Sequence, residues 1–121
     1  MPMQIEGQGF TVKEAKFDFF FGRVTSNPTN QQRSLQNRNN LLRLGIDEAA
    51  GGRERLMAMF AVGLTAQITK EEEKEYGIVI TRKVEVSSAQ AAGAIEIGYL
   101  YRGGDTSTIP EVVTIIPKIY R

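Results

Sequence analysis

At Tyr76 the spacing of apolar residues along the sequence changes from a helical period to that of a β-strand. Before it, Leu56, Phe60 and Leu64 recur at every fourth position, and after it apolar residues recur at every second position. The strand-like segments are joined by short connections, so we expect them to pair antiparallel. The sequence therefore predicts an α+β fold, with two helices packed on one face of a small antiparallel sheet of three to four strands.

The strand pattern marks three segments after Tyr76, at residues 76–86, 94–102 and 111–116. Pro117 is expected to end the third, because proline cannot donate a hydrogen bond to a neighbouring strand. A further short strand is predicted within residues 10–21, where Phe17, Phe19 and Phe21 alternate. Residues 65–75, with the acidic run EEEKE, are expected to form a loop or a solvated turn.

Two helices are predicted before Tyr76. Asn27 and Pro28 form a start signal for the first, with asparagine as the cap and proline at the first helical position. Gly45 is the residue expected just after its end. The second helix is expected to begin at Asp47, or else at the Gly51-Gly52 pair.

Composition limits the chemistry that the chain can perform. Its 121 residues include neither cysteine nor histidine, so thiolate metal sites and catalysis by imidazole are excluded. No cofactor and no metal are expected. The length fits one domain, which we assign to residues 10–121, after a loose N-terminus at residues 1–9. The net charge of +1 leaves room for a local basic face without making the whole molecule a polycation.

The sequence contains no targeting signal that we can identify. No run of about 18 apolar residues is present, and the opening MPMQIEGQGF lacks the basic and apolar regions of a signal peptide. We therefore expect a cytoplasmic protein that does not enter a membrane.

The segment TNQQRSLQNRNN at residues 29–40 is unusually polar for a helix, with seven amide side chains, two arginines and one apolar residue, Leu35. A helix that only covers a core shows apolar residues at every third or fourth position. Arginine presents a planar fork of donors suited to phosphate, and amides bond base edges and sugar hydroxyls. The predicted substrate-binding residues are Asn30, Ser34, Gln36 and Arg38. The alternative interpretation is a solvated, well-capped surface helix.

The exposed face of the predicted sheet is the second candidate site, with Lys83, Glu85, Glu96 and Arg102. A ribonuclease without histidine needs cations to stabilise the transition state and another group to move protons. The predicted catalytic residues are Arg23, Arg33, Lys83 and Glu85. The alternative is cross-strand ion pairing on a solvated face.

The sequence also resembles C-terminal toxin domains of bacterial polymorphic and contact-dependent systems. The similarity covers residues 17–60 well and the remainder only in layout. It is carried by FGRV at residues 21–24, by LGID at residues 44–47, and by Ser26, Asn30, Arg33, Ser34, Gln36 and Gly52.

This resemblance implies a toxin domain, with nuclease activity and a barnase/RelE-like plan of helices followed by an antiparallel sheet. It also implies a cognate immunity protein as partner. The chain departs from the family in two ways: Thr29 stands where the family has histidine, and the sequence starts at Met1, so we expect a free-standing domain.

Three functions remain open on these grounds. The first is a toxin-like ribonuclease that acts on RNA, or another phosphate-bearing ligand, without histidine. The second is a non-catalytic scaffold or interaction protein that forms a homo-oligomer. The third is RNA binding without cleavage.

Overall fold

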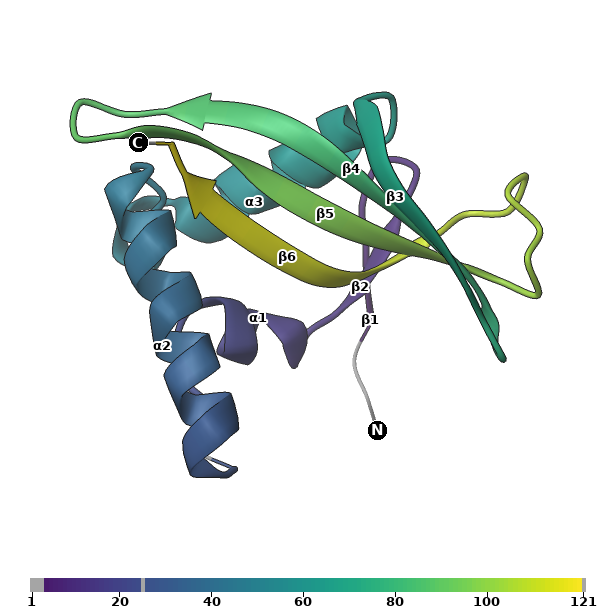
Figure 1. The fold of residues 1–121 in the computed structure, drawn as a ribbon, viewed down its shortest axis with the longest axis horizontal. Coiled ribbons are helices and arrows are strands. Elements are labelled where there is room, and N and C mark those ends of the chain that lie inside the picture. The colour runs from purple at the N-terminus through teal and green to yellow at the C-terminus, as the bar shows by residue number, and fades with distance from the viewer. Residues whose placement is uncertain (1–3, 25, 121) are drawn as a thin grey trace.

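The computed structural model describes residues 4–24 and 26–120 (Figure 1). Its helical elements are α1 (Lys16–Phe20), α2 (Pro28–Arg43), the short 3-10 helix η1 (Glu48–Ala50) and α3 (Gly52–Gly63). Its strands are β1 (Gln4–Glu6), β2 (Thr11–Lys13), β3 (Gln67–Lys74), β4 (Gly77–Ser87), β5 (Ala92–Arg102) and β6 (Glu111–Ile119).

All six strands belong to one curled sheet in the order β1-β2-β6-β5-β4-β3. Neighbouring strands run antiparallel, except that β2 runs parallel to β6. The predicted fold class is therefore wrong: in the described residues the sheet is mixed and has six strands, and three α-helices accompany it. Figure 1 shows α3 behind the sheet and α2 along the side of β6.

Strand β3 is the largest element that the sequence pattern missed, because residues 65–75 were expected to form a loop. Seven of its eight residues are exposed, so no apolar alternation marks it. It lies at the edge of the sheet, where charged side chains are common because they discourage pairing with another chain. Backbone pairing with β4, from Gln67 to Lys74, holds it in place.

The phenylalanine-rich segment also differs from its prediction. Residues 16–20 form the helix α1, and the predicted strand shrinks to Thr11–Lys13. Phe17 and Phe20 are both buried and lie one helical turn apart, with their rings edge to face at 5.7 Å. The effective period was therefore the helical spacing from Phe17 to Phe20, not the alternation through Phe19. Part of the expected loose N-terminus, Gln4–Glu6, forms β1.

The long helix agrees with its predicted signals. The Asn27 side chain accepts a hydrogen bond from the Asn30 backbone N–H, Pro28 occupies the first turn, and Gly45 has a φ of +83°. Asp47 caps η1, and α3 begins at Gly52. No helix in the described part of the chain is long and apolar enough to cross a membrane.

The core lies between the sheet and the helices, and Tyr99 of β5 is at its centre. Its side chain is fully buried, and its hydroxyl donates a hydrogen bond of 2.7 Å to the Phe60 carbonyl of α3. Burial raises the pKa of Tyr99. A Cβ atom at Gly63 would lie 2.2 Å from the Tyr99 hydroxyl oxygen, so α3 approaches the sheet closely only because this residue is glycine.

Strand β6 continues to Ile119, through the proline that was expected to end it. The Pro117 carbonyl accepts a bond from Asn40, so this residue directs its backbone polar groups toward α2. The N–H that proline lacks would therefore point away from β5, and the pairing with β5 is kept. Strand β2 covers this edge of β6 only at Glu111 and Val112, which leaves the rest of the edge to α2.

Candidate functional site

A cleft of 640 Å³ lies between α2, α1 and the part of the β6 edge, after Val112, that no described strand covers; we call it the α2–β6 cleft. Three cationic side chains and three carboxamides line it, together with two phenylalanines and a stretch of β6 backbone. None of the described residues in its lining is acidic. The lining residues are Lys13, Ala15, Lys16, Phe19, Phe20, Arg33, Gln36, Asn37, Asn40 and residues 113–117.

Two of the carboxamides hold α2 against the uncovered edge of β6. The Asn37 side-chain N–H donates to the Ile115 carbonyl at 3.2 Å, and that of Asn40 donates to the Pro117 carbonyl at 3.5 Å. These bonds replace part of the ladder that a neighbouring strand would supply. Part of the amide content of the helix is therefore structural. The Oδ1 atom of Asn37 is buried, and no hydrogen-bond partner for it lies in the described part of the chain.

The three cations of the cleft come from three elements: Lys13 ends β2, Lys16 begins α1, and Arg33 lies in α2. Lys13 has a long ion pair of 3.9 Å with Glu111. Neither Lys16 nor Arg33 has an ion pair with any residue that the structure describes. Two cations without an ion pair among the described residues, beside a third with a long one, give the cleft a positive potential that attracts anions.

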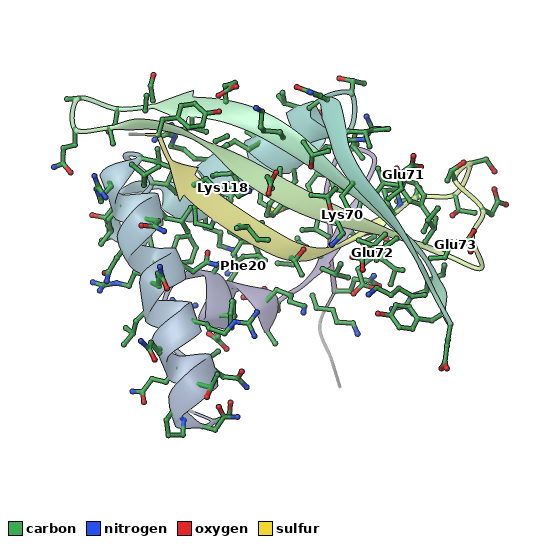
Figure 2. The ribbon with its side chains drawn as sticks, in the orientation of Figure 1. Phe20, Lys70, Glu71, Glu72, Glu73 and Lys118 are labelled. Carbon is green, nitrogen blue, oxygen red and sulfur yellow. The ribbon has the colours of Figure 1, made fainter. Side chains whose placement is uncertain are left out.

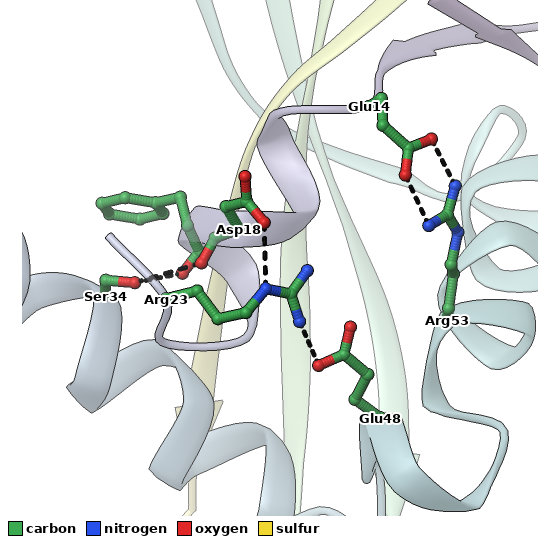
Figure 3. A network of polar contacts seen from close by, with 7 residues as sticks. Glu14, Asp18, Arg23, Ser34, Glu48 and Arg53 are labelled. Carbon is green, nitrogen blue, oxygen red and sulfur yellow. Dashed lines mark hydrogen bonds and ion pairs between the residues drawn. The ribbon is translucent and has the colours of Figure 1, made fainter. Parts of the chain in front are cut away.

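Arg23 has a different environment from Arg33. Its Nε donates to Asp18 at 2.9 Å, and its Nη1 donates to Glu48, so the side chain ties α1 to η1 (Figure 3). The hydrogen bond that Arg23 donates to Glu48 is the main cause that raises the pKa of Arg23. Arg23 is outside the lining of the α2–β6 cleft.

Ser34 is fully buried and joins α2 to α1, because its hydroxyl donates a 2.7 Å hydrogen bond to the Phe19 carbonyl (Figure 3). Asn30 lies at the start of α2, where its side chain donates to Ser26 at 3.4 Å. Arg38 packs beside Gly22, where an added Cβ would be 2.8 Å from its Cδ.

The structure therefore divides the residues predicted from the polar segment. It places Arg33 and Gln36 in one cleft. The other predicted residues lie outside its lining: Arg23, Asn30, Ser34 and Arg38. Lys13 and Lys16 are the cationic residues of the cleft that were not predicted from the sequence. No local pattern marks these two lysines, because the pairing of β2 with β6 is what brings them to the cleft.

Lys83 and Glu85 lie on the open face of the sheet, which is the face that carries Glu96 and Lys118 and is turned away from α3 (Figure 2). Glu85 accepts a 2.6 Å bond from the Tyr120 hydroxyl, and the Lys83 ammonium lies 3.7 Å from its other oxygen. The bond to Glu85 raises the pKa of Tyr120. Glu96, opposite Lys83 in the register, pairs with Lys118 at 3.0 Å.

This open-face cluster is an ion-paired network, as the alternative interpretation of the sheet face expected. It also brings together a carboxylate, an ammonium and a phenol, which are groups that can move protons in the absence of imidazole. Lys83 and Glu85 lie in β4, two strands away from β6, and they are outside the lining of the α2–β6 cleft.

No family model matches the chain. No curated protein matches it either. Among solved structures, a chain of the "Contact-dependent growth inhibition toxin - immunity protein complex from Klebsiella pneumoniae 342" has the same fold, with a TM-score of 0.70. The two chains are 24% identical, and the alignment covers 88% of this chain and 98% of the other.

At this identity the likeness establishes the fold alone. The chain has the fold of a component of a contact-dependent growth inhibition toxin–immunity complex. The resemblance noted in the sequence is confirmed at that level. The motif that carried it stays a prediction.

Proposed function

We propose that this chain is a toxin-type domain that binds RNA in the α2–β6 cleft and cleaves it without histidine. The observation that carries the proposal is the convergence of Lys13, Lys16 and Arg33 on a cleft whose described lining has no carboxylate. The arginine fork and the two ammonium groups suit phosphate, and Gln36 beside them suits a base or a ribose hydroxyl. The fold shared with a toxin–immunity complex supports the toxin reading.

A cognate immunity protein is the partner that this function requires. The solved neighbour is a complex of a toxin with an immunity protein. We infer that such a partner would cover the α2–β6 cleft or the open face, because either contact would exclude RNA. Its contact surface would carry acidic groups that are complementary to the cations of the cleft.

Cleavage is assigned to the open-face cluster. Attack of a ribose 2′-hydroxyl on the adjacent phosphorus breaks the bond to the 5′-oxygen, and it needs one proton removed from the nucleophile and one supplied to the leaving oxygen. Glu85 would accept the first proton, and Lys83 or Tyr120 would supply the second. Cations near the phosphate would stabilise the charge that develops in the transition state.

The test compares purified wild-type protein with Arg33→Ala and Arg43→Ala on tRNA and total RNA. Arg43 is an exposed arginine in the last turn of α2, outside the cleft, so its variant matches the change in charge. We expect Arg33→Ala to lose binding and cleavage, and Arg43→Ala to keep both. Glu85→Gln should keep binding and lose cleavage. Equal activity in the wild type and Arg33→Ala would refute the proposal.

The salt dependence of binding adds a second readout. Three phosphate contacts predict that the logarithm of affinity falls with the logarithm of salt concentration with a slope of about −2, since each contact on a single strand contributes about −0.7. Arg33→Ala should make that slope shallower by about 0.7. An unchanged slope would show that Arg33 does not contact phosphate.

RNA binding without cleavage is the second candidate function. It is favoured by the absence of a carboxylate from the described lining of the cleft, which leaves no proton acceptor at the anion site itself. Binding that depends on Arg33, together with RNA that stays intact, would select this function over the first.

A further inference from the structure

A second cavity, of 760 Å³, lies on the open face of the sheet; we call it the open-face cavity. It shares Lys13, Lys16, Val113, Thr114 and Ile116 with the α2–β6 cleft. The two hollows therefore meet at β6, with the two lysines at their junction. A ligand that is longer than one cavity can continue from the cleft across β6 onto the sheet.

The surplus of positive charge continues into the open-face cavity, which is lined by five cationic and three acidic side chains. Glu72 lies between Lys70 at 3.3 Å and Lys74 at 3.2 Å, and Figure 2 shows it beside Lys70. The hydrogen bond from Lys74 is the main cause that lowers the pKa of Glu72, and the bond from Lys70 adds to it. Arg102 pairs with Glu111 at 2.9 Å. The acidic groups are thus neutralised by neighbours, which leaves Lys16 at the junction available to a phosphate.

An aromatic side chain borders each hollow. Phe19 of α1 is half-buried in the lining of the α2–β6 cleft. Tyr76, in the turn between β3 and β4, lines the open-face cavity and is 55% exposed. The Tyr76 ring is not part of the hydrophobic core. Aromatic faces beside a cationic groove are the usual means of binding unpaired bases, because every base can stack on them.

We infer that the two cavities form one path for single-stranded RNA, with one base stacked on Phe19, the backbone crossing β6 beside Lys13 and Lys16, and another base stacked on Tyr76. The inference rests on the proposed function and narrows its substrate to unpaired segments. In a duplex the bases stack on one another, and their faces are not available to protein rings. The substrates are therefore loops or single strands long enough to reach both rings.

The test measures the affinity of end-labelled single-stranded oligonucleotides of about 4 and about 12 nucleotides, within the roughly 4–16 nucleotides that single-strand grooves cover. We expect Tyr76→Ala to weaken the longer oligonucleotide by at least about fivefold, the lower end of base stacking, and to leave the shorter one unchanged. Tyr76→Phe keeps the ring and should bind both as the wild type does. Arg33→Ala should weaken both.

The outcomes separate the two proposals. If Arg33→Ala weakens binding but Tyr76→Ala has no effect at either length, the path is overturned and the proposed function stands. If the wild type binds neither oligonucleotide, or Arg33→Ala binds as the wild type does, the proposed function fails. A duplex that binds as tightly as the single strand also overturns the path. Tyr76 lies in an exposed turn, and circular dichroism of each variant checks that it is folded.

Discussion

Replacing Ser34 by alanine tests whether this residue supports the fold or binds the substrate. Its hydroxyl is fully buried and donates to the Phe19 carbonyl at 2.7 Å. That carbonyl also accepts the Gly22 N–H at 3.3 Å, so it keeps one partner, and the loss is that of an ordinary hydrogen bond, about 0.5–1.5 kcal/mol. Alanine has a higher helix propensity than serine, which offsets about 0.5 kcal/mol of this loss.

The net effect expected for Ser34→Ala is a loss of up to about 1 kcal/mol, which lowers the melting temperature by up to about 4 °C for a chain of this length. Arg33→Ala, the neighbouring change on an exposed residue, should change stability by less than about 0.5 kcal/mol. Melting temperatures are measured by thermal denaturation, and RNA affinity is measured well below them. Ser34→Ala should lower the melting temperature and keep the affinity, whereas Arg33→Ala should keep the melting temperature and lower the affinity. A Ser34→Ala protein with unchanged stability and weakened RNA binding would refute this reasoning.

Three further predictions concern contacts described above. Gly63→Ala should lower the free energy of unfolding by about 1–3 kcal/mol because its Cβ would meet the Tyr99 hydroxyl. Chemical denaturation should show a smaller loss when the same change is made in a Tyr99→Phe protein. Equal losses in both proteins would contradict the close contact. The bond from Arg53 is the main cause that lowers the pKa of Glu14 below 4.5, so this pair stabilises the fold above pH 4.5 and the effect is lost as the pH falls through the folded pKa. The melting temperature of Glu14→Gln should accordingly lie below that of the wild type at pH 7 and meet it once the pH has fallen below the folded pKa of Glu14, whereas a constant difference would contradict the pairing. Asn37→Ala removes a bond to β6 and should lower the urea midpoint by an amount equivalent to about 1 kcal/mol; an unchanged midpoint would show that the bond contributes nothing.

Local signals in the sequence predicted the elements that depend on local physics. The cap, the first-turn proline and the closing glycine defined α2, and apolar alternation defined β4 and β5. Strand β3 was missed because its side chains face solvent, and β1 because it has three residues. Strand β2 is the part of the strand predicted within residues 10–21 that the structure keeps. The parallel pairing of β2 with β6 joins distant parts of the chain, and no local pattern reports it.

The candidate site was likewise predicted from the sequence only where local signals mark it. The concentration of amides and arginines drew attention to the helix that forms one wall of the cleft. It did not separate Arg33, which lines the cleft, from Arg23, which is tied to Asp18 and Glu48. Asp18, five residues before Arg23, was the one nearby clue to that contact. The contributions of Lys13 and Lys16 required the three-dimensional fold.

The bond from Asn37 to Ile115 joins residues 78 positions apart, and it lies in the wall of the α2–β6 cleft. Contacts of such long range form only when most of the chain has already condensed, so a partly folded molecule has no cleft. A ligand bound there therefore stabilises the molecule against unfolding of the whole chain, and not only against local opening. Any oligonucleotide that occupies this hollow should slow hydrogen exchange even in the most protected amides of the central strands, far from its own contacts.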